Sequence, residues 1–132
     1  MNARLQVRDY MSRHLVTLHR ETEVMHAVHM LTKKEISGAP VIDTEGRLIG
    51  LLTEKDCLRA VLNASYYSEY GGTVEEIMTT EVETMEPDLG LVDAAKRFVD
   101  KGFHRYPVVD DGTLIGQISR SDVMRALSDV WQ

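Results

Sequence analysis

The stretch APVIDTEGRLIGLLTEKDCLRAV (residues 39–61) has a counterpart further along the same chain, YPVVDDGTLIGQISRSDVMRAL (residues 106–127). Both stretches contain Pro-Val, an Asp, the run Gly-x-Leu-Ile-Gly, a hydroxyl residue followed three positions later by Asp, and a closing Arg-Ala. Self-similarity of this kind indicates an internal repeat. We therefore expect the chain to fold as two copies of one structural unit.

The repeat extends outward from these stretches to residues 7–62 and 74–128, which align with one small gap. Met11 then matches Met78 near the start of each copy. A copy of this length is too small to build a robust core alone, so the two copies are expected to pack together.

The stretch between the copies, NASYYSEYGGT (residues 63–73), contains a Gly-Gly pair and lacks clean periodicity. These properties are typical of a connecting segment. The sequence therefore predicts a first repeat at residues 1–64, a linker at 65–73 and a second repeat at 74–132.

Each copy predicts the same order of elements, β-α-β-β-α, which makes the fold class α+β. The first helix has apolar residues at i, i+3, i+4 and i+7, the pattern of an amphipathic helix. Turn residues separate two short strands, and the hydroxyl residue after the second strand opens another helix. The expected elements of the first copy are 16–18, 22–34, 40–42, 47–52 and a helix from Thr53. Those of the second are 83–85, a helix around 91–98 that stops at Gly102, 107–109, 113–118 and a helix from Ser119.

Composition limits the class of protein. Of 132 residues, 43% are hydrophobic and 27% are charged, an ordinary globular balance. The net charge of -6 argues against a nucleic-acid partner, because such binding depends on neutralising phosphates. No apolar run approaches the roughly 20 residues needed to cross a bilayer, and the N-terminus lacks the apolar region of a signal peptide. The single cysteine, Cys57, fits a reducing cytoplasm.

The order of elements and the motifs resemble the CBS domain family in both halves of the chain. The resemblance rests on GLLTEKD (residues 50–56) and GQISRSD (116–122), and on the openings Met11-Ser12 and Met78-Thr79. Gln117 departs from the apolar residue usual at its position. The resemblance implies two repeats packed as a pseudo-twofold pair, a Bateman module, with two clefts. It also implies a homodimer and a ligand such as AMP, ATP, a related adenosine compound or S-adenosylmethionine.

The two helix starts are the first candidate ligand contacts. A helix N-terminus exposes unpaired N–H groups and positive partial charge, which suits an anion. A carboxylate one turn later can accept hydrogen bonds from ribose hydroxyls. By the resemblance, Thr53 and Ser119 lie on the phosphate or ribose side, and Asp56 and Asp122 hold the ribose. The same spacing is that of a capping box, and the two roles are compatible, so the sequence leaves both open.

His104-Arg105-Tyr106-Pro107 is the second candidate element. His104 and Arg105 can direct donors at a phosphate, and the resemblance places such residues beside the nucleotide phosphates. Solvated charges at a strand entry are the alternative. A residue before proline is held extended, which leaves the backbones of Ala39 and Tyr106 available to an adenine edge. The Tyr106 ring either stacks on a base or is a half-buried strand residue.

The two copies differ at equivalent positions. Copy one has Ser-Gly-Ala-Pro where copy two has His-Arg-Tyr-Pro, and it has Glu54 where copy two has Arg120. Because Glu54 repels an anion, the cleft built around Ser119 and Asp122 is expected to be the better phosphate site. Whether His104 and its neighbours reach the other cleft stays open. The candidate ligand-binding residues are Thr17, Ala39, Pro40, Thr53, Asp56, Thr84, His104, Arg105, Tyr106, Pro107, Ser119, Arg120 and Asp122.

The sequence lacks a P-loop lysine motif, a triad-like set and a metal-ligand cluster, so we expect neither an enzyme nor a metal or cofactor. His26 and His29 lie one turn apart without a third ligand at tight spacing. The leading hypothesis is a regulatory module that binds AMP, ADP or ATP. Few residues lie outside the repeats, so it would act in trans on an unknown partner protein. The alternatives are a ligand-independent dimerisation or docking scaffold and a sensor of S-adenosylmethionine.

Overall fold

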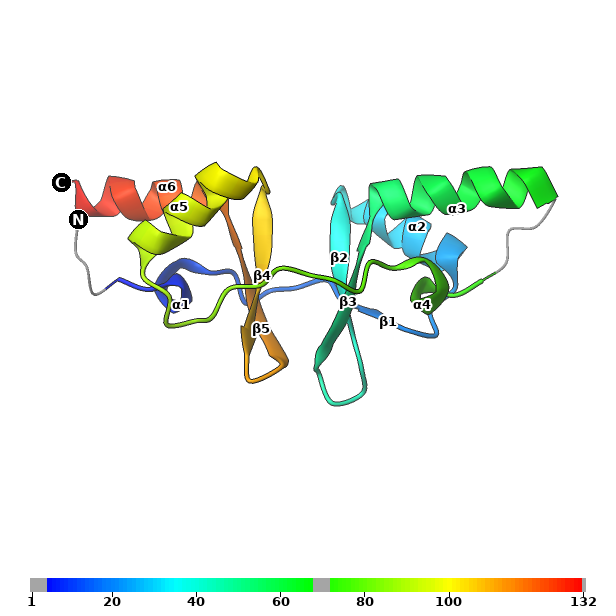
Figure 1. Cartoon of the computed structure of the whole chain (residues 1–132), viewed down its shortest axis with the longest axis horizontal. Helices are drawn as coiled ribbons and strands as arrows, with labels where there is room; N and C mark the ends of the chain where they lie inside the picture. Colours follow the sequence, from blue (N-terminus) through cyan, green and yellow to red (C-terminus); the bar gives the residue numbers. More distant parts are fainter. Residues whose placement is uncertain (1–4, 68–71, 132) are drawn as a thin grey trace. The chain divides into compact units, whose positions relative to one another are not determined.

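The computed structural model describes residues 5–67 and 72–131, drawn in Figure 1. Helices and strands are mixed, which confirms the predicted α+β class. The chain divides into two compact units. The first unit is Val16–Val82, and the second combines the segment up to Leu15 with the residues from Glu83 onward.

The first unit contains a three-stranded sheet in the order β1-β2-β3. Strand β1 runs parallel to β2, and β2 runs antiparallel to β3. The elements are β1 (Leu18–His19), α2 (Val24–Lys34), β2 (Gly38–Ile42), β3 (Leu48–Thr53), α3 (Glu54–Tyr67) and the short helix α4 (Val74–Ile77).

The second unit repeats this plan with one strand fewer. Its antiparallel pair is β4 and β5, and the expected strand at 83–85 is reduced to a single parallel bridge between Met85 and Val108. The elements are the short helix α1 (Val7–Tyr10), α5 (Leu91–Lys101), β4 (Arg105–Asp110), β5 (Thr113–Ser119) and α6 (Arg120–Val130).

Each unit is completed by the opening segment of the other sequence repeat. In the first unit, Leu51 of β3 and Thr79 exchange two backbone hydrogen bonds of 2.8 and 2.9 Å. In the second, Gln117 of β5 and Ser12 do the same, at 2.9 and 2.8 Å. The compact units therefore divide the chain differently from the duplication in its sequence. The repeat limits 1–64, 65–73 and 74–132 stay a prediction.

The close approach of these opening segments explains the glycine shared by the two motifs. A Cβ on Gly50 would lie 2.5 Å from the sulfur of Met78, and one on Gly116 would lie 2.6 Å from the sulfur of Met11. Real Cβ atoms essentially never come this close, so a side chain at either position would force the opening segment to shift.

Two separate apolar cores result, one in each unit. In the first, Ala27 and Leu31 of α2 pack with Val41 and Leu52 of the sheet. Helix α5 ends at Gly102 in the left-handed conformation, as the sequence predicts, and α3 continues to Tyr67, inside the predicted linker. Residues 68–71 of that linker lie outside the described residues. Within 5–67 and 72–131, no helix is long and apolar enough to cross a membrane.

Candidate functional site

Both candidate helix starts form capping boxes. At α3, the amide of Thr53 donates to Asp56 Oδ2 at 3.0 Å, and the amide of Asp56 donates to Thr53 Oγ1 at 3.2 Å. At α6, the corresponding distances are 2.8 Å from Ser119 N to Asp122 Oδ2 and 3.2 Å from Asp122 N to Ser119 Oγ. Each aspartate therefore has one oxygen in the cap and keeps Oδ1 for other partners.

The remaining partners of Asp56 enclose it within the first unit. The Thr79 hydroxyl lies 3.3 Å from both carboxylate oxygens, and Arg59 Nη1 lies 3.5 Å from Oδ1. Asp56 is only 5% exposed. Its carboxylate is thus occupied by the protein's own donors on both oxygens.

Asp122 has fewer neighbours and a more open carboxylate. Arg125 Nη1 lies 3.1 Å from Oδ1, and the Asp122 side chain is 15% exposed. Arg125 also donates to the carbonyl of Tyr10 at 3.1 Å, and its guanidinium lies over the Tyr10 ring. The Tyr10 hydroxyl donates to Asp129 at 2.8 Å. This network fixes Asp122 from one side and leaves part of it accessible.

Sequence reasoning did not identify these supporting residues. For Arg59 and Arg125 a signal exists, because the shared Arg-Ala places an arginine three residues after each aspartate, where helix neighbours pair. For Thr79 and Tyr10 no local signal exists, since both reach the carboxylate or its arginine from a distant part of the chain.

His104 and Arg105 lie at the entry of β4, and both are exposed. The carbonyl of His104 accepts from the amide of Arg120 at 3.1 Å, and Arg105 is the register partner of Ser119. The structure therefore brings these two residues beside the start of α6, in the same unit as Asp122. This part of the second unit contains an imidazole, a guanidinium, a helix N-terminus, a hydroxyl and a carboxylate.

Tyr106 belongs to the core. It is 1% exposed, its hydroxyl donates to the carbonyl of Arg97 at 3.3 Å, and its ring packs edge-on against Phe98 and Phe103. Burial raises the pKa of this phenol. Between the two possibilities that the sequence left open, the ring has the packing role, and it is more deeply buried than the half-buried strand residue considered there.

Arg120 has a structural attachment that the sequence did not predict. Its Nε and Nη2 atoms donate to the carbonyls of Phe103 and Gly102, both at 2.9 Å. The guanidinium therefore closes the end of α5 and the loop before β4, although the residue as a whole is exposed. Its positive charge is held in place at the start of α6.

The other candidates fall into both units. Thr17 immediately precedes β1, and Ala39 and Pro40 are buried in β2 of the first unit. Thr84 lies in the second unit, where its carbonyl accepts from Arg97 at 3.2 Å, and Pro107 is buried in β4. The described parts of the chain contain no group of three His, Cys, Asp or Glu residues placed to hold a metal ion.

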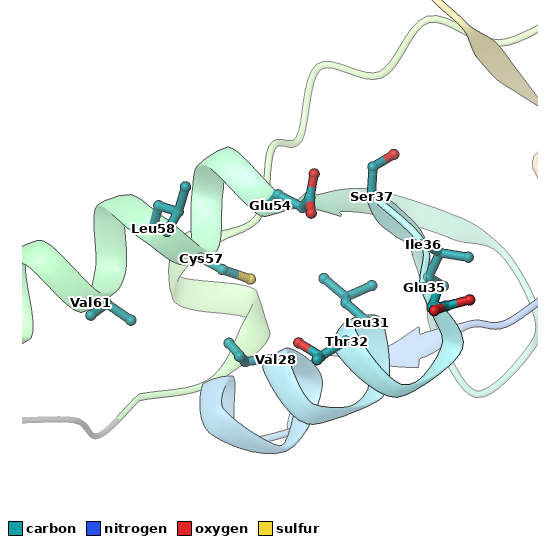
Figure 2. Close-up of a pocket in the computed structure, with 10 residues that line it drawn as sticks. All are labelled: Val28, Leu31, Thr32, Glu35, Ile36, Ser37, Glu54, Cys57, Leu58 and Val61. Atoms are coloured by element: carbon teal, nitrogen blue, oxygen red, sulfur yellow. The ribbon is translucent and has the colours of Figure 1, made fainter.

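A groove between the two long helices of the first unit was not predicted from the sequence. This α2–α3 groove, shown in Figure 2, has a volume of about 640 Å³. Val28 and Leu31 of α2 face Cys57, Leu58 and Val61 of α3 across it. Burial raises the pKa of the Cys57 thiol, as do the nearby carboxylates, so this thiol is not an activated nucleophile.

The second unit has the corresponding α5–α6 groove, with a volume of about 440 Å³. Phe98 and Val99 of α5 line it together with Val123, Met124 and Leu127 of α6. Each unit thus combines a polar helix start with an apolar groove between its two long helices.

Comparison with known proteins identifies the family. The model of the CBS domain matches residues 7–63 and 74–129, which is most of the chain in two copies. The chain belongs to the CBS domain family. The resemblance seen in the motifs is therefore confirmed, and the chain is a tandem CBS pair.

Two solved CBS pairs and one curated relative are similar over nearly the whole chain. The crystal structure of CBSX2 from Arabidopsis thaliana in complex with AMP has 30% identity and a TM-score of 0.83, over 96% of this chain and 98% of that one. The CBS pair of protein MJ0100, in complex with 5-methylthioadenosine and S-adenosyl-L-methionine, has 28% identity and a TM-score of 0.75, over 96% and 98%.

The curated relative is protein MJ1225 of Methanocaldococcus jannaschii, 33% identical over 125 residues. The match covers 95% of this chain and 44% of that protein, so the chain spans less than half the length of this relative. Two CBS pairs similar to this one are thus known in complex with adenosine-type ligands.

Proposed function

We propose that this CBS pair is a regulatory module that binds a phosphorylated adenosine, AMP, ADP or ATP, at the start of α6. The observation that carries the proposal is the polar surface of the second unit. There an accessible Asp122 carboxylate and the Ser119 hydroxyl lie at a helix N-terminus whose neighbouring strand entry bears exposed His104 and Arg105.

The chemistry of this surface matches the parts of a nucleotide. The N-terminus of α6, together with the Arg105 guanidinium and the N–H donor of the His104 ring at the entry of β4, favours a phosphate. The free side of Asp122 is suited to accept hydrogen bonds from the ribose hydroxyls. Arg105 has the stronger role in this scheme, because a guanidinium can donate two parallel hydrogen bonds to one phosphate.

The first unit is less suited to this role. Asp56 is enclosed by Thr79 and Arg59, and Glu54 brings a negative charge to the start of α3. We therefore propose that the second unit provides the phosphate and ribose contacts. Thr17, Ala39 and Pro40, which belong to the first unit, remain candidate ligand contacts on the evidence of the sequence and the family alone.

The solved relatives support the ligand class and leave its identity to experiment. AMP is bound to CBSX2, whereas the MJ0100 pair holds 5-methylthioadenosine and S-adenosyl-L-methionine. All three contain adenosine, and only AMP carries a phosphate. The donors of His104 and Arg105 are the reason to place this chain with the phosphate binders.

The proposal extends to regulation. Ligand binding would favour one arrangement of the CBS pair over another, and a partner protein that distinguishes the arrangements would respond in trans. We further propose that the chain forms a homodimer. The single, buried cysteine fits a reducing cytoplasm as the place of action.

Isothermal titration of AMP, ADP, ATP, adenosine and S-adenosylmethionine tests the ligand. Arg105→Ala is the informative variant, because Arg105 is exposed and its loss should spare the fold. We expect about 10- to 100-fold weaker AMP binding, with adenosine binding unchanged. Lys96→Ala, which removes an exposed cation from α5, is the matched control.

One structural observation favours a second function. Both aspartates already serve in complete capping boxes, as a ligand-independent scaffold would require. A wild-type protein that forms a stable oligomer but binds none of the five compounds would establish the scaffold. Equal affinity of wild type and Arg105→Ala for AMP would remove the phosphate site from the proposal.

A further inference from the structure

Arg125 joins the start of α6 to the short helix α1. Its Nη1 atom donates to Asp122 Oδ1 and its Nη2 atom donates to the carbonyl of Tyr10, both at 3.1 Å. Tyr10 is the last residue of α1, so the second bond satisfies a carbonyl that a helix end leaves without a partner in the helix. One guanidinium thus ties the carboxylate proposed to hold the ribose to a residue 115 positions earlier in the chain.

Tyr10 holds the other side of this guanidinium. The carbon at the centre of the Arg125 guanidinium lies 5.4 Å from the centre of the Tyr10 ring, close enough for the ring to attract the cation. The Tyr10 hydroxyl donates to Asp129 at 2.8 Å, and Asp129 follows Arg125 by one turn of α6. Helix α1 is therefore attached to two successive turns of α6, and Arg125 lies between Tyr10 and Asp122.

The first unit holds its aspartate in a different way. The equivalent arginine, Arg59, lies 3.5 Å from Asp56 Oδ1. Ile77 stands at the position of Tyr10, so α4 offers neither a hydroxyl nor an aromatic ring there. The Thr79 hydroxyl instead lies 3.3 Å from both oxygens of Asp56 and closes the carboxylate. Among the described residues, the attachment through a tyrosine therefore belongs to the unit with the more accessible aspartate.

Asp122 keeps the capacity to accept two further hydrogen bonds. An ionised carboxylate can accept about four. The described residues use two of these positions, with the Ser119 amide on Oδ2 and Arg125 on Oδ1. The two hydroxyls of a ribose can therefore bind without displacing Arg125. Because the carboxylate is held at both oxygens, it cannot rotate, and its open positions keep one direction.

We propose that Arg125 is the positioning residue for ribose recognition at Asp122, and that Tyr10 couples this recognition to the docking of α1. The inference rests on the proposed function, since it needs a ribose at the start of α6. While α1 is docked, Arg125 keeps its place and orients the carboxylate. When α1 withdraws, Arg125 loses the Tyr10 carbonyl and ring. By linkage, a bound ribose stabilises the docked α1 by the same factor as docking strengthens ribose binding.

Titration with AMP and 2′-deoxy-AMP tests the positioning role. The two compounds differ by one ribose hydroxyl, so the ratio of their dissociation constants isolates that hydroxyl. We expect wild type to prefer AMP by about tenfold and Arg125→Ala by only about two- to threefold. Arg125→Lys should restore part of the preference, because an ammonium keeps the charge without the two-sided contact. A variant that is merely less folded binds both compounds less, and its ratio is unchanged.

Arg59→Ala is the matched control, since it removes the equivalent arginine from the enclosed Asp56. We expect its ratio to equal that of wild type. Tyr10→Phe tests the coupling, because phenylalanine keeps the ring and loses the hydroxyl that binds Asp129. Although this hydroxyl does not bind Asp122, its loss should lower the preference for AMP by about twofold.

Hydrogen exchange measures the same coupling from the side of α1. The amide of Ser12, just after α1, donates to the carbonyl of Gln117 at 2.8 Å, so its exchange reports withdrawal of the opening segment. At saturation, AMP should slow this exchange about two- to threefold more than 2′-deoxy-AMP does. In Tyr10→Phe the difference between the two compounds should shrink.

The outcomes separate this inference from the proposed function. An unchanged ratio in Arg125→Ala overturns the positioning role, while AMP binding by wild type preserves the proposed function. Equal affinity of wild type for the two compounds also overturns it, because Asp122 then does not recognise the ribose. A lower ratio in Arg125→Ala with equal Ser12 exchange under both compounds supports the positioning role and overturns the coupling. Wild type that binds neither compound removes the proposed function and this inference together.

Discussion

Asp56 and Asp122 occupy the same place in the two repeats and have different surroundings. Both cap a helix through Oδ2. Asp56 also accepts from Thr79 and is buried, whereas among the described residues Arg125 is the one further side-chain partner of Asp122, which is partly accessible. The equivalent of Thr79 is Ser12, whose hydroxyl accepts from the amide of His14 at 3.3 Å. The opening segment thus donates to the carboxylate from Thr79 in the first unit, whereas Ser12 in the second unit makes its hydrogen bond with His14.

The comparison separates the shared role of the motif from the role that diverged. Capping is common to both copies, because each helix needs its first amides satisfied. Access to the second carboxylate oxygen differs, because it depends on the segment that packs over the helix start. A repeat can therefore keep its fold and its helix cap after duplication while the access to its carboxylate changes.

The largest expected effect distinguishes the two aspartates by stability. Asp56→Ala removes a buried carboxylate and leaves the partly buried Thr53 amide and the Thr79 hydroxyl without their acceptor, and we expect a loss of about 2–3 kcal/mol. Asp122→Ala removes a more exposed cap and should cost about 1–2 kcal/mol. Urea unfolding followed by circular dichroism measures both.

Glu54→Ala serves as the control, because this exposed residue begins the same helix without a bond from its carboxylate to a described residue. Equal losses for the two aspartate variants would mean that the enclosure of Asp56 adds nothing to stability. The two aspartates would then differ only in how accessible their carboxylates are.

A second prediction concerns a feature that the units share. Gly50→Ala and Gly116→Ala each place a methyl group against a methionine sulfur and a backbone carbonyl, Thr79 O or Ser12 O. Because the carbonyl cannot move aside easily, we expect each variant to lose about 2 kcal/mol. Gly90→Ala is a useful control, since a Cβ there would meet nothing closer than 3.9 Å.

Thermal unfolding of the three variants measures the effect. Similar losses at positions 50 and 116 would support equivalent packing of the two opening segments. A loss at only one of them would show that the other segment can withdraw from its strand.

Much of this fold was predictable because its signals are local. The helix expected at 22–34 is α2 at Val24–Lys34, and the strands expected at 40–42 and 113–118 are parts of β2 and β5. Periodicity, turn residues and the duplication itself carry that information. The helix starts were predicted for the same reason, since the hydroxyl and the aspartate are three residues apart.

The rest depends on contacts between distant parts of the chain. Helices α1 and α4 have four residues each, too few for a periodic pattern, and nothing local indicates that each completes the unit of the other repeat. The enclosure of Asp56 by Thr79 depends on that exchange. Burial of Tyr106 likewise follows from Phe98 and Phe103, which come from α5 and the loop after it.

Smaller effects are expected for the arginines that follow each aspartate. Arg125 contacts Asp122, the Tyr10 carbonyl and the Tyr10 ring, whereas the ion pair of Arg59 is with Asp56. We expect Arg125→Ala to cost about 1 kcal/mol and Arg59→Ala about 0.3 kcal/mol.

Chemical unfolding in low and high salt measures this difference. Lysine at position 125 keeps the charge and loses one of the two hydrogen bonds of Arg125, so Arg125→Lys should recover only part of the loss. A greater loss for Arg59→Ala than for Arg125→Ala would contradict the assignment of the wider network to the second unit.

The smallest expected effect is a pH dependence confined to the second unit. The hydrogen bond from the Tyr10 hydroxyl to Asp129, reinforced by desolvation and by the charge of that carboxylate, raises the pKa of Tyr10 above its ordinary value of 10.0. The unfolded chain therefore loses the phenolic proton first as the pH rises. The stabilisation is complete below about pH 10 and is lost as the pH passes through the raised pKa of the folded state.

Tyr10→Phe removes this contribution, because phenylalanine has no hydroxyl to donate or to ionise. Wild type should be slightly more stable than Tyr10→Phe near neutral pH, and the gap should narrow at alkaline pH. Asp129→Asn keeps an acceptor without the charge. In this background, the stability gap between the protein with Tyr10 and its Tyr10→Phe variant should narrow at a lower pH than it does with Asp129 in place. In the first unit, Ile77 stands at the position equivalent to Tyr10 and has nothing to titrate. A gap that stays constant up to the alkaline limit of folding would mean that the Tyr10 hydroxyl does not engage Asp129 in solution.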